Sequence, residues 1–452
     1  MRLRTLGYPF ATILASTFAL SACSGSAPAK APAAATKNAK LAPATDKDGD
    51  DPGAAGATSK STAELFAREH APMKKQAVSL FEGRITGKIE AAAPITPECT
   101  MDEKRWYCSF SVPMGQDAAG DEYSVECDAT AGTTPFSEAV KSVQGQDSTL
   151  TTPPVLWVQT RGDALRVQFT ANLAARDDEN TVGTLKLAAY YADGYTLMCH
   201  DRRAGAMKTF PRVVNGFWDS LVRTPTSTPV AVQRYLLREG DTPVGFREKY
   251  AQRTDDGGIE ETYLSFRMRT DGKTWSVWDH GQYWERDADG KVLEVTHTWW
   301  QDGAKSLTMN AKATEAGRYR VKSTVGEASN AIELTPKAPL GTEWSSALKF
   351  RELGAAKKEF RYADPKLDES QDPSFNYIVL RPAKTGLLKE TEEPHVAPRG
   401  NKRTPSADDL FIDERGVVKK EVAEDHVAEL IFERGTYPEL RAKKSHPKNN
   451  KK

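Results

Sequence analysis

The sequence predicts a β-rich α+β protein, in which a disulfide-stapled α+β domain precedes a curved antiparallel meander sheet or open barrel. Short runs rich in β-branched and aromatic residues recur along the chain, as strands require. Glycine turn signals arrive in series between Gly257 and Gly317, as short hairpins require. Four of the five cysteines lie between residues 99 and 199. Because single cores stop growing near ~250–300 residues, 452 residues indicate at least two domains.

The first 22 residues are typical of an export signal. Arg2 and Arg4 precede a mostly apolar run, residues 8–20, which leads into Leu20-Ser21-Ala22-Cys23. This end resembles the lipobox of bacterial lipoproteins. The resemblance implies that Cys23 receives lipid, including an acyl chain such as palmitate, and becomes N-terminal after cleavage. Several hydrocarbon tails together give stable anchoring. Ser24, where the enterobacterial retention signal has Asp, implies the outer membrane. An ordinary signal peptide is the alternative.

Residues 23–60 are predicted to be the lipidated cysteine followed by a disordered linker. Most of the segment is Ala, Pro, Gly, Ser, Thr, Lys and Asp, with no aromatic residue. Such a segment cannot bury enough apolar area to offset its chain entropy. The aspartates of residues 46–51 suggest a calcium loop, but Asp51 and Ala57 stand where an EF-hand needs Gly and Glu. We therefore interpret them as a solvated spacer.

The remaining cysteines predict two disulfides, because they are even in number in an exported chain. They are Cys99, Cys108, Cys127 and Cys199. A zinc site is disfavoured because no Cys-x₂-Cys pair is present. Pairing Cys99 with Cys108 and Cys127 with Cys199 is compatible with the spacing, and so is a Cys108–Cys127 bridge across a hairpin. The run Cys199-His200-Asp201 is not expected to be catalytic, because neighbouring strand residues point to opposite faces.

The domain predicted for residues 61–223 mixes strands with short helices. A capping-box pattern starts a helix at Ser61, and Pro72 ends it. Helices are also expected at 135–143 and at 210–221, the latter with Thr209 as N-cap. Strands are expected at 104–112, 121–130, 155–160, 164–171, 184–191 and 195–200. The run Leu197–His200, followed by a loop and a helix, resembles the PsbP-like sandwich, and this resemblance implies no catalytic residues.

A Thr- and Pro-rich linker, residues 224–229, separates this domain from a second one predicted at 230–440. Strands are expected there at 245–253, 259–269, 274–279, 282–286, 292–301, 306–313, 317–324 and 427–432, and residues 410–418 are expected to form a strand, a turn and a second strand. Little helix is indicated, so the sheet must curl to bury a face. This strand-and-turn rhythm resembles the curved sheets of LolA/LolB-like lipoprotein carriers. Residues 441–452 are predicted to be a solvated basic tail.

Aromatic residues mark the second domain as the candidate binding region. Alternation places Leu264, Phe266 and Met268 on one face of their strand, with Tyr263 and Arg267 on the other. Six of the nine tryptophans also lie here, so aromatic residues occur on both faces of the sheet and one set needs a cover. That cover is the chain itself, a partner or a ligand. The ligand-binding candidates are Trp275, Trp284, Trp299 and His297.

No catalytic, cofactor or metal motif is present: G-x-S-x-G, H-E-x-x-H, the P-loop and G-x-G-x-x-G are all missing. The equal counts of 62 basic and 62 acidic residues argue against nucleic acid. We therefore expect a non-enzymatic, membrane-anchored envelope lipoprotein that binds a lipid, lipoprotein or protein partner. One alternative is a hydrolase of envelope polymers that uses carboxylates or His297. The other is a purely structural scaffold. A carrier needs an apolar pocket, a hydrolase needs two facing carboxylates in a cleft, and a scaffold needs neither.

Overall fold

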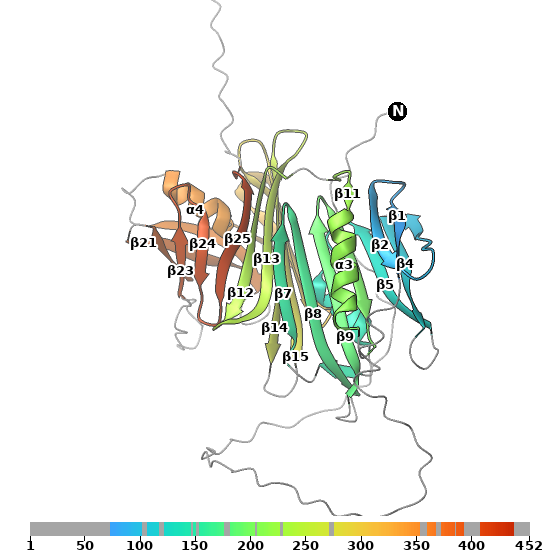
Figure 1. Ribbon diagram of the computed structural model, residues 1–452. Helices are drawn as coiled ribbons and strands as arrows, with labels where there is room; N and C mark the ends of the chain where they lie inside the picture. The colour runs from blue at the N-terminus through green and yellow to red at the C-terminus, as the bar shows by residue number, and fades with distance from the viewer. Residues whose placement is uncertain are drawn as a thin grey trace, which may run out of the picture. The chain divides into compact units, whose positions relative to one another are not determined.

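A computed structural model describes the folded part of the chain (Figure 1). The described residues are 73–101, 106–116, 122–145, 148–150, 153–175, 181–203, 206–226, 229–270, 275–352, 359–367, 372–384, 386–392 and 407–437. The expected signal, Cys23, the linker, the helix from Ser61 and the tail at 441–452 lie outside these residues. None of the helices in the described ranges is both long and apolar enough to cross a membrane.

The β-rich character and the antiparallel pairing are confirmed. One run of strands has the order β3-β4-β5-β10-β9-β8-β7, and β6 also pairs with β8. The bounds are β3 Glu98–Met101, β4 Trp106–Gln116, β5 Glu122–Ala131, β6 Ser148–Leu150, β7 Val155–Arg161, β8 Ala164–Ala175, β9 Thr181–Ala192 and β10 Tyr195–Asp201. The expected hairpin at 104–130 is therefore present as β4 and β5.

Helix α3 (Thr209–Ser220) lies across β8 and β9 in Figure 1 and also packs against β2. Strand β2 (Ile85–Ala91) belongs to a three-stranded sheet with β1 (Lys74–Leu80) and β11 (Val222–Arg223). The helix buries its apolar stripe there, with the Phe217 ring 6.0 Å from that of Phe110. The expected N-cap at Thr209 is wrong. The Phe210 N–H already bonds the Ala206 carbonyl, so the N-cap is Lys208.

Both expected disulfides are confirmed, and the strand register explains their pairing. Cys99 lies opposite Cys108 in β3 and β4, and Cys127 lies opposite Cys199 in β5 and β10. The cross-hairpin alternative is wrong, because Cys108 faces Ala129 across the hairpin. Directly opposed residues bring their Cβ atoms close enough for a disulfide. Each bond therefore joins neighbouring strands of the same sheet.

Helix α2 (Phe136–Gln144), expected at 135–143, joins the two segments that the sequence separates. Phe136 makes edge contacts with Phe169 on one side and with Phe246 and Phe266 on the other. All four rings belong to one core cluster, which takes residues from both segments. A bridge between Leu150 and Trp275 further connects β6 to β15 (Trp275–Arg286). The division into domains 61–223 and 230–440 stays a prediction.

Asp279 of β15 accepts a 2.6 Å hydrogen bond from the Ser137 N–H at the start of α2. The side chain is buried, with 1% exposed. Burial raises the pKa of Asp279 to about 7, although the hydrogen bonds from Ser137 oppose this shift. An unfolded aspartate has a pKa near ~3.9. Between these two values the folded state binds the proton and the unfolded state does not, so this group's contribution to stability falls as pH rises.

The Asp279→Asn variant should remove this titration and keep an oxygen to accept the Ser137 bond. Its free energy of unfolding, relative to that of the original protein, should therefore increase from pH 5 to pH 7, by at most about 1.4 kcal/mol per pH unit. Urea denaturation at several pH values measures this difference. Asp289→Asn, at an exposed turn, is the matched control and should leave the slope unchanged. If the difference in free energy of unfolding between Asp279→Asn and the original protein did not change with pH, the raised pKa of Asp279 would be contradicted.

The second run of strands is a long meander whose ends are open. Its order is β19-β18-β17-β16-β15-β14-β13-β12-β25-β24-β23-β22-β21-β20. The bounds not yet given are β12 Ala231–Glu239, β13 Thr242–Arg253, β14 Ile259–Thr270, β16 Val292–Gln301, β17 Ala304–Ala313, β18 Tyr319–Val325, β19 Ala328–Leu334, β20 Phe360–Leu367, β21 Pro373–Lys384, β22 Leu387–Glu392, β23 Ala407–Ile412, β24 Val418–Val422 and β25 Val427–Gly435.

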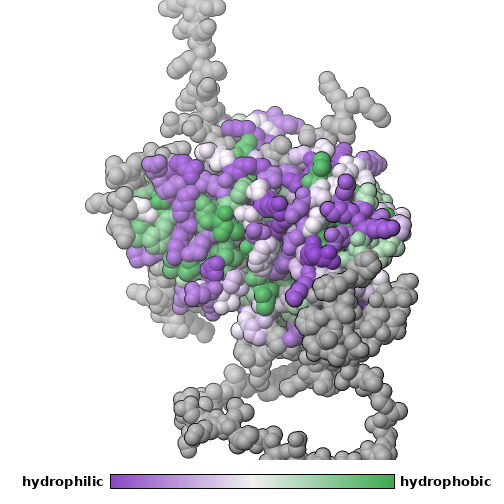
Figure 2. All heavy atoms as spheres, in the orientation of Figure 1, coloured by the Kyte–Doolittle hydropathy of each residue, from purple (hydrophilic) through white to green (hydrophobic). Residues whose placement is uncertain are grey.

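The meander curls so that its two ends meet without pairing. Strands β17 to β19 lie against β20 and β21, and a core cluster that includes Met309, Val321 and Phe375 fills the space between them. The expected curved sheet is therefore present, and the sheet is not closed. On the face in view in Figure 2, apolar residues form patches among hydrophilic ones, and a large patch lies around β24 and β25.

Two parts of this meander differ from expectation. The strands expected at 274–279 and 282–286 are one continuous strand, β15, because Gly281 pairs normally with Leu264 and Thr298 on both sides. Helix α4 (Glu343–Glu352), strands β12 and β19, and strands β20 to β22 were not expected. The helix was missed because its apolar residues do not recur at the spacing that places them along one side of a helix.

Candidate functional site

A cavity of about 180 Å³ lies inside the curl of the second run of strands, the meander described above. Its walls come from β13, β14 and β15 on one side and from β20, β21 and β22 on the other, and the segment leading into α4 also contributes. The residues that line it are Lys249, Glu261, Thr262, Tyr263, His280, Gln282, Trp284, Gly341, Thr342, Glu343, Trp344, Tyr362, Asp364, Ile378 and Glu390. The cavity therefore has both aromatic and charged walls.

A connected group of rings stands on the β14–β16 wall. His280 lies at its centre, stacked on Trp299 with centroids 4.6 Å apart and 5.6 Å from the Tyr263 ring. His297 lies 5.5 Å from His280 and 5.9 Å from Trp284. These residues come from neighbouring strands, on positions whose side chains share one face. The curl points this face inward.

The structure brings together three of the four predicted ligand-binding residues. Trp284 lines the cavity. His297 and Trp299 are not lining residues, but both contact His280, which is one. Trp275 lies apart, packed against the core cluster beneath α2. It occupies the other end of β15, where the strand meets β6. The aromatic residues predicted to share one binding face therefore lie in two separate groups, one at the cavity and one beneath α2.

Three cations of the chain neutralise carboxylates in this interior. Lys249 Nζ lies 3.0 Å from Glu343 Oε1, and Arg286 Nε lies 2.7 Å from Glu261 Oε1. Arg247 binds Glu421 through two hydrogen bonds. Because the pairs are mostly shielded from water, each charge depends strongly on its partner.

Glu390 of β22 is a carboxylate without such a cation. Within the described part of the chain, its polar partner is the Tyr362 hydroxyl, which donates a 3.2 Å hydrogen bond to Oε2. Burial raises the pKa of Glu390 well above its usual range, and the nearby carboxylates of Glu343, Glu421 and Asp408 raise it further. The surroundings of Glu390 therefore favour the protonated carboxyl over the carboxylate.

The two histidines carry buried ring nitrogens without hydrogen bonds in the described structure: Nε2 of His280 and both nitrogens of His297. His297 Nε2 lies 3.3 Å from Asp364 Oδ1, close but without hydrogen-bond geometry. Burial lowers the pKa of His280 well below its usual range, and the neighbouring His297 and Arg247 lower it further. His280 is therefore a neutral ring that borders the cavity, with an unused nitrogen.

Several lining residues were missed by sequence reasoning. Tyr362, Asp364 and Glu390 lie on the unexpected strands, and Glu343 and Trp344 begin the unexpected helix. The alternation of Tyr362 and Asp364 around Ala363 was the one local signal that indicated a strand with a polar inner face. Lone carboxylates have no sequence signature of their own, so Glu390 was not detectable in this way.

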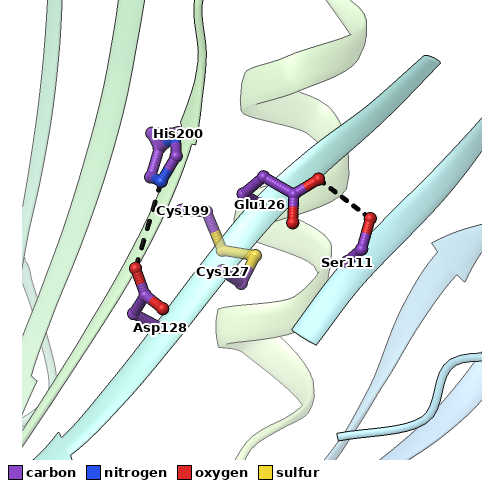
Figure 3. The surroundings of a disulfide bond; sticks show 6 residues. All are labelled: Ser111, Glu126, Cys127, Asp128, Cys199 and His200. Atoms are coloured by element: carbon purple, nitrogen blue, oxygen red, sulfur yellow. Dashed lines mark hydrogen bonds and ion pairs between the residues drawn. A yellow bond between two sulfur atoms is a disulfide. The ribbon is translucent and has the colours of Figure 1, made fainter. Parts of the chain in front are cut away.

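The Cys199-His200-Asp201 run has the geometry that the sequence predicts. Cys199 is bonded to Cys127, and His200 points to the other side of the strand, where its Nε2 lies 3.9 Å from Asp128 Oδ2 (Figure 3). Asp201 forms a 2.7 Å ion pair with Lys186. A nucleophilic thiolate is not available here because the sulfur is consumed by the disulfide.

No cluster of three or more His, Cys, Asp or Glu side chains suited to a metal ion occurs within the described ranges. No family model matches the chain, and neither does any curated protein.

Two solved structures are similar over part of its length. One is a β-barrel-like protein of a domain of unknown function, DUF1849, from Brucella abortus: 13% identity, TM-score 0.34, covering 46% of this chain and 97% of that chain. The other is a DUF1089 family protein from Pseudomonas aeruginosa: 12% identity, TM-score 0.24, covering 38% and 87%. At these TM-scores, neither carries an argument about this chain.

Proposed function

We propose that the protein is a lipid-anchored, non-enzymatic protein of the bacterial cell envelope that binds a ligand inside the curl of its second run of strands. The anchor is Cys23, and the outer membrane is the proposed location. The observation that carries the binding role is the cavity of about 180 Å³ with aromatic and charged walls. Concave sites with a few convergent polar groups are the usual form of ligand pockets.

The composition of the walls narrows the kind of ligand. A carrier of whole acyl chains needs an apolar interior, but here four carboxylates and a lysine line the cavity. Its volume also lies below the ~300 Å³ at which pockets for larger ligands begin. A small polar ligand, or the polar head of a larger one, therefore fits better than a hydrocarbon chain.

The hydrolase alternative is favoured by one observation. Glu390 has a raised pKa, as a general acid requires, and other carboxylates share its cavity. Against it stands the small volume, because an enzyme that cleaves within a polymer needs a groove that accommodates units on both sides of the cleaved bond. Release of soluble fragments from envelope polymers by the purified protein, abolished in Glu390→Gln, would establish this alternative instead.

The anchor and the binding role are tested with the full chain and with its Cys23→Ser variant, both exported in a bacterial host. The original chain should sediment with membranes and incorporate labelled palmitate, and Cys23→Ser should do neither. Cys23→Ser, purified from the periplasm without detergent, should retain a small-molecule adduct in native mass spectrometry. Trp284→Phe should lose adduct, since this ring lines the cavity.

Trp218→Phe is the matched control, because Trp218 is similarly buried but lies on α3 and packs in another core cluster, away from the cavity. It should keep the adduct. A soluble original chain would contradict the anchor. An adduct-free mass for Cys23→Ser, together with no binding of any added probe, would contradict the binding role and favour a scaffold.

A further inference from the structure

The interior of the curl binds cations of the chain in a repeated arrangement of carboxylate and ring. The Lys249 ammonium lies 5.2 Å from the centroid of the Tyr235 ring and 5.8 Å from that of Tyr263, with Glu343 as its counter-ion. Aromatic faces attract cations within about 6 Å, especially where water is excluded. An ammonium group is therefore already accommodated in this interior.

Arg286 repeats the arrangement on β15, which β14 separates from β13 in the sheet. Its guanidinium lies 5.7 Å from the centroid of the Trp284 ring, and its counter-ion is Glu261. Both Trp284 and Glu261 line the cavity. The same combination of an acid and an aromatic ring thus holds a cation at two places on the β13–β15 wall of the cavity.

On the opposite wall, the acid and the rings are present and the cation is missing. Glu390 accepts the Tyr362 hydroxyl, and Asp364 projects from the same strand as Tyr362. In the described part of the chain, neither carboxylate has a Lys or Arg within ion-pair distance, although His297 lies near Asp364. The buried Nε2 of His280, which has no hydrogen-bond partner there, borders the same space.

From this arrangement we propose that the cavity binds an organic cation, a ligand with an ammonium group that is held by Glu390 and Asp364 among the rings of Tyr362, Trp344 and Trp284. This inference rests on the proposed binding function and names its ligand class. A free small amine and the amine headgroup of a lipid share this chemistry. A volume of about 180 Å³ accommodates such a group without its hydrocarbon tail.

Proton release should accompany binding. The charged or titratable groups around Glu390 come from several elements: Tyr362 and Asp364 of β20, Glu343 of α4, Asp408 of β23, Glu421 of β24, and Arg247 and Lys249 of β13. Because burial and the acids among them raise its pKa, Glu390 must lose a proton to pair with a cation. Affinity for the cation should therefore increase as pH rises through the range in which Glu390 loses its proton.

Isothermal titration of the full-length Cys23→Ser protein tests the inference with three probes: choline, ethanolamine and 3,3-dimethyl-1-butanol, the neutral analogue of choline. At least one of the two amines should bind and change the tryptophan fluorescence. The neutral analogue should bind the original cavity about 10-fold more weakly or not at all. The ligand that binds the original cavity should lose affinity by a similar factor for the Glu390→Gln or Asp364→Asn variant. Glu333→Gln, on exposed strand β19, is the matched control and should bind normally.

Vesicles distinguish the two sources of the amine. Binding to phosphatidylethanolamine vesicles but not to phosphatidylglycerol vesicles, prevented by Glu390→Gln, indicates a lipid headgroup. Binding of the free amines without vesicle binding indicates a small solute. Equal binding of the neutral analogue, binding of calcium in place of the amines, or failure of both amines would each overturn the cation inference. If the periplasmic protein still carries an adduct in that case, the binding function stands and only its ligand class is wrong.

Discussion

Removing the Cys127–Cys199 disulfide with two alanine substitutions should lower the free energy of unfolding by about 4 kcal/mol, the amount expected for a loop of this length. The bond closes a loop of 72 residues, which restricts the unfolded chain strongly. Both cysteines are also buried in the core beneath α3, so their loss removes apolar contacts as well. The midpoint of urea denaturation measures the effect.

The Cys99–Cys108 disulfide is the internal control for this prediction. It closes only 9 residues, and its strand β3 is exposed along its whole length. The corresponding double alanine variant should therefore lose less, about 2.5 kcal/mol. If losing the Cys99–Cys108 disulfide destabilised the protein more than losing the Cys127–Cys199 disulfide, the loop-length argument would be wrong for this fold.

The Glu421→Gln variant should be destabilised by about 3 kcal/mol, because it leaves the Arg247 guanidinium buried without its main counter-ion. The two side chains are each 8% exposed and join β13 to β24 through two hydrogen bonds. Burial alone would raise the pKa of Glu421, but Arg247, assisted by Lys249 and His426, lowers it to about 2. Thermal and urea denaturation at neutral pH measure the loss.

Two comparisons show whether the buried pair is responsible. Glu429→Gln, on β25, removes an exposed acid whose ion pairs lie in water, so it should cost about 0–1 kcal/mol. The double variant Arg247→Met with Glu421→Leu should be more stable than Glu421→Gln, since it leaves no unpaired charge. Because the pKa of Glu421 is lowered in the folded state, the advantage of the original protein should be complete above pH ~4.3 and decline toward pH 2. A loss that does not change with pH would contradict this account.

Local patterns predicted the strands because a strand exposes its two faces in alternation. Leu264, Phe266 and Met268 are buried while Tyr263 and Arg267 are half-buried on the other face, as expected. The glycine turns and the Phe210–Leu221 periodicity were similarly informative. The break expected between residues 279 and 282 is absent, because Gly281 pairs with neighbouring strands on both sides, which local alternation does not reveal.

The candidate site was predictable only in part. Trp284, Trp299 and His297 were found because aromatic residues are conspicuous in alternating strands, but Trp275 shares the same pattern and lies elsewhere. Which rings meet depends on where β15 passes from the core under α2 into the curl. A period-two pattern contains no information about that position.

Local patterns along the chain were enough to predict a β-rich, antiparallel protein whose four cysteines form two disulfides. Which cysteines pair and which acids lie in the cavity depend instead on contacts between distant segments. Arg247 and Glu421 are separated by 174 positions, and Lys249 and Glu343 by 94. The physical reason is that strand formation depends on neighbours along the chain, whereas the curl of the sheet, set by the packing of its two ends, brings β13 to β15 opposite β20 to β22.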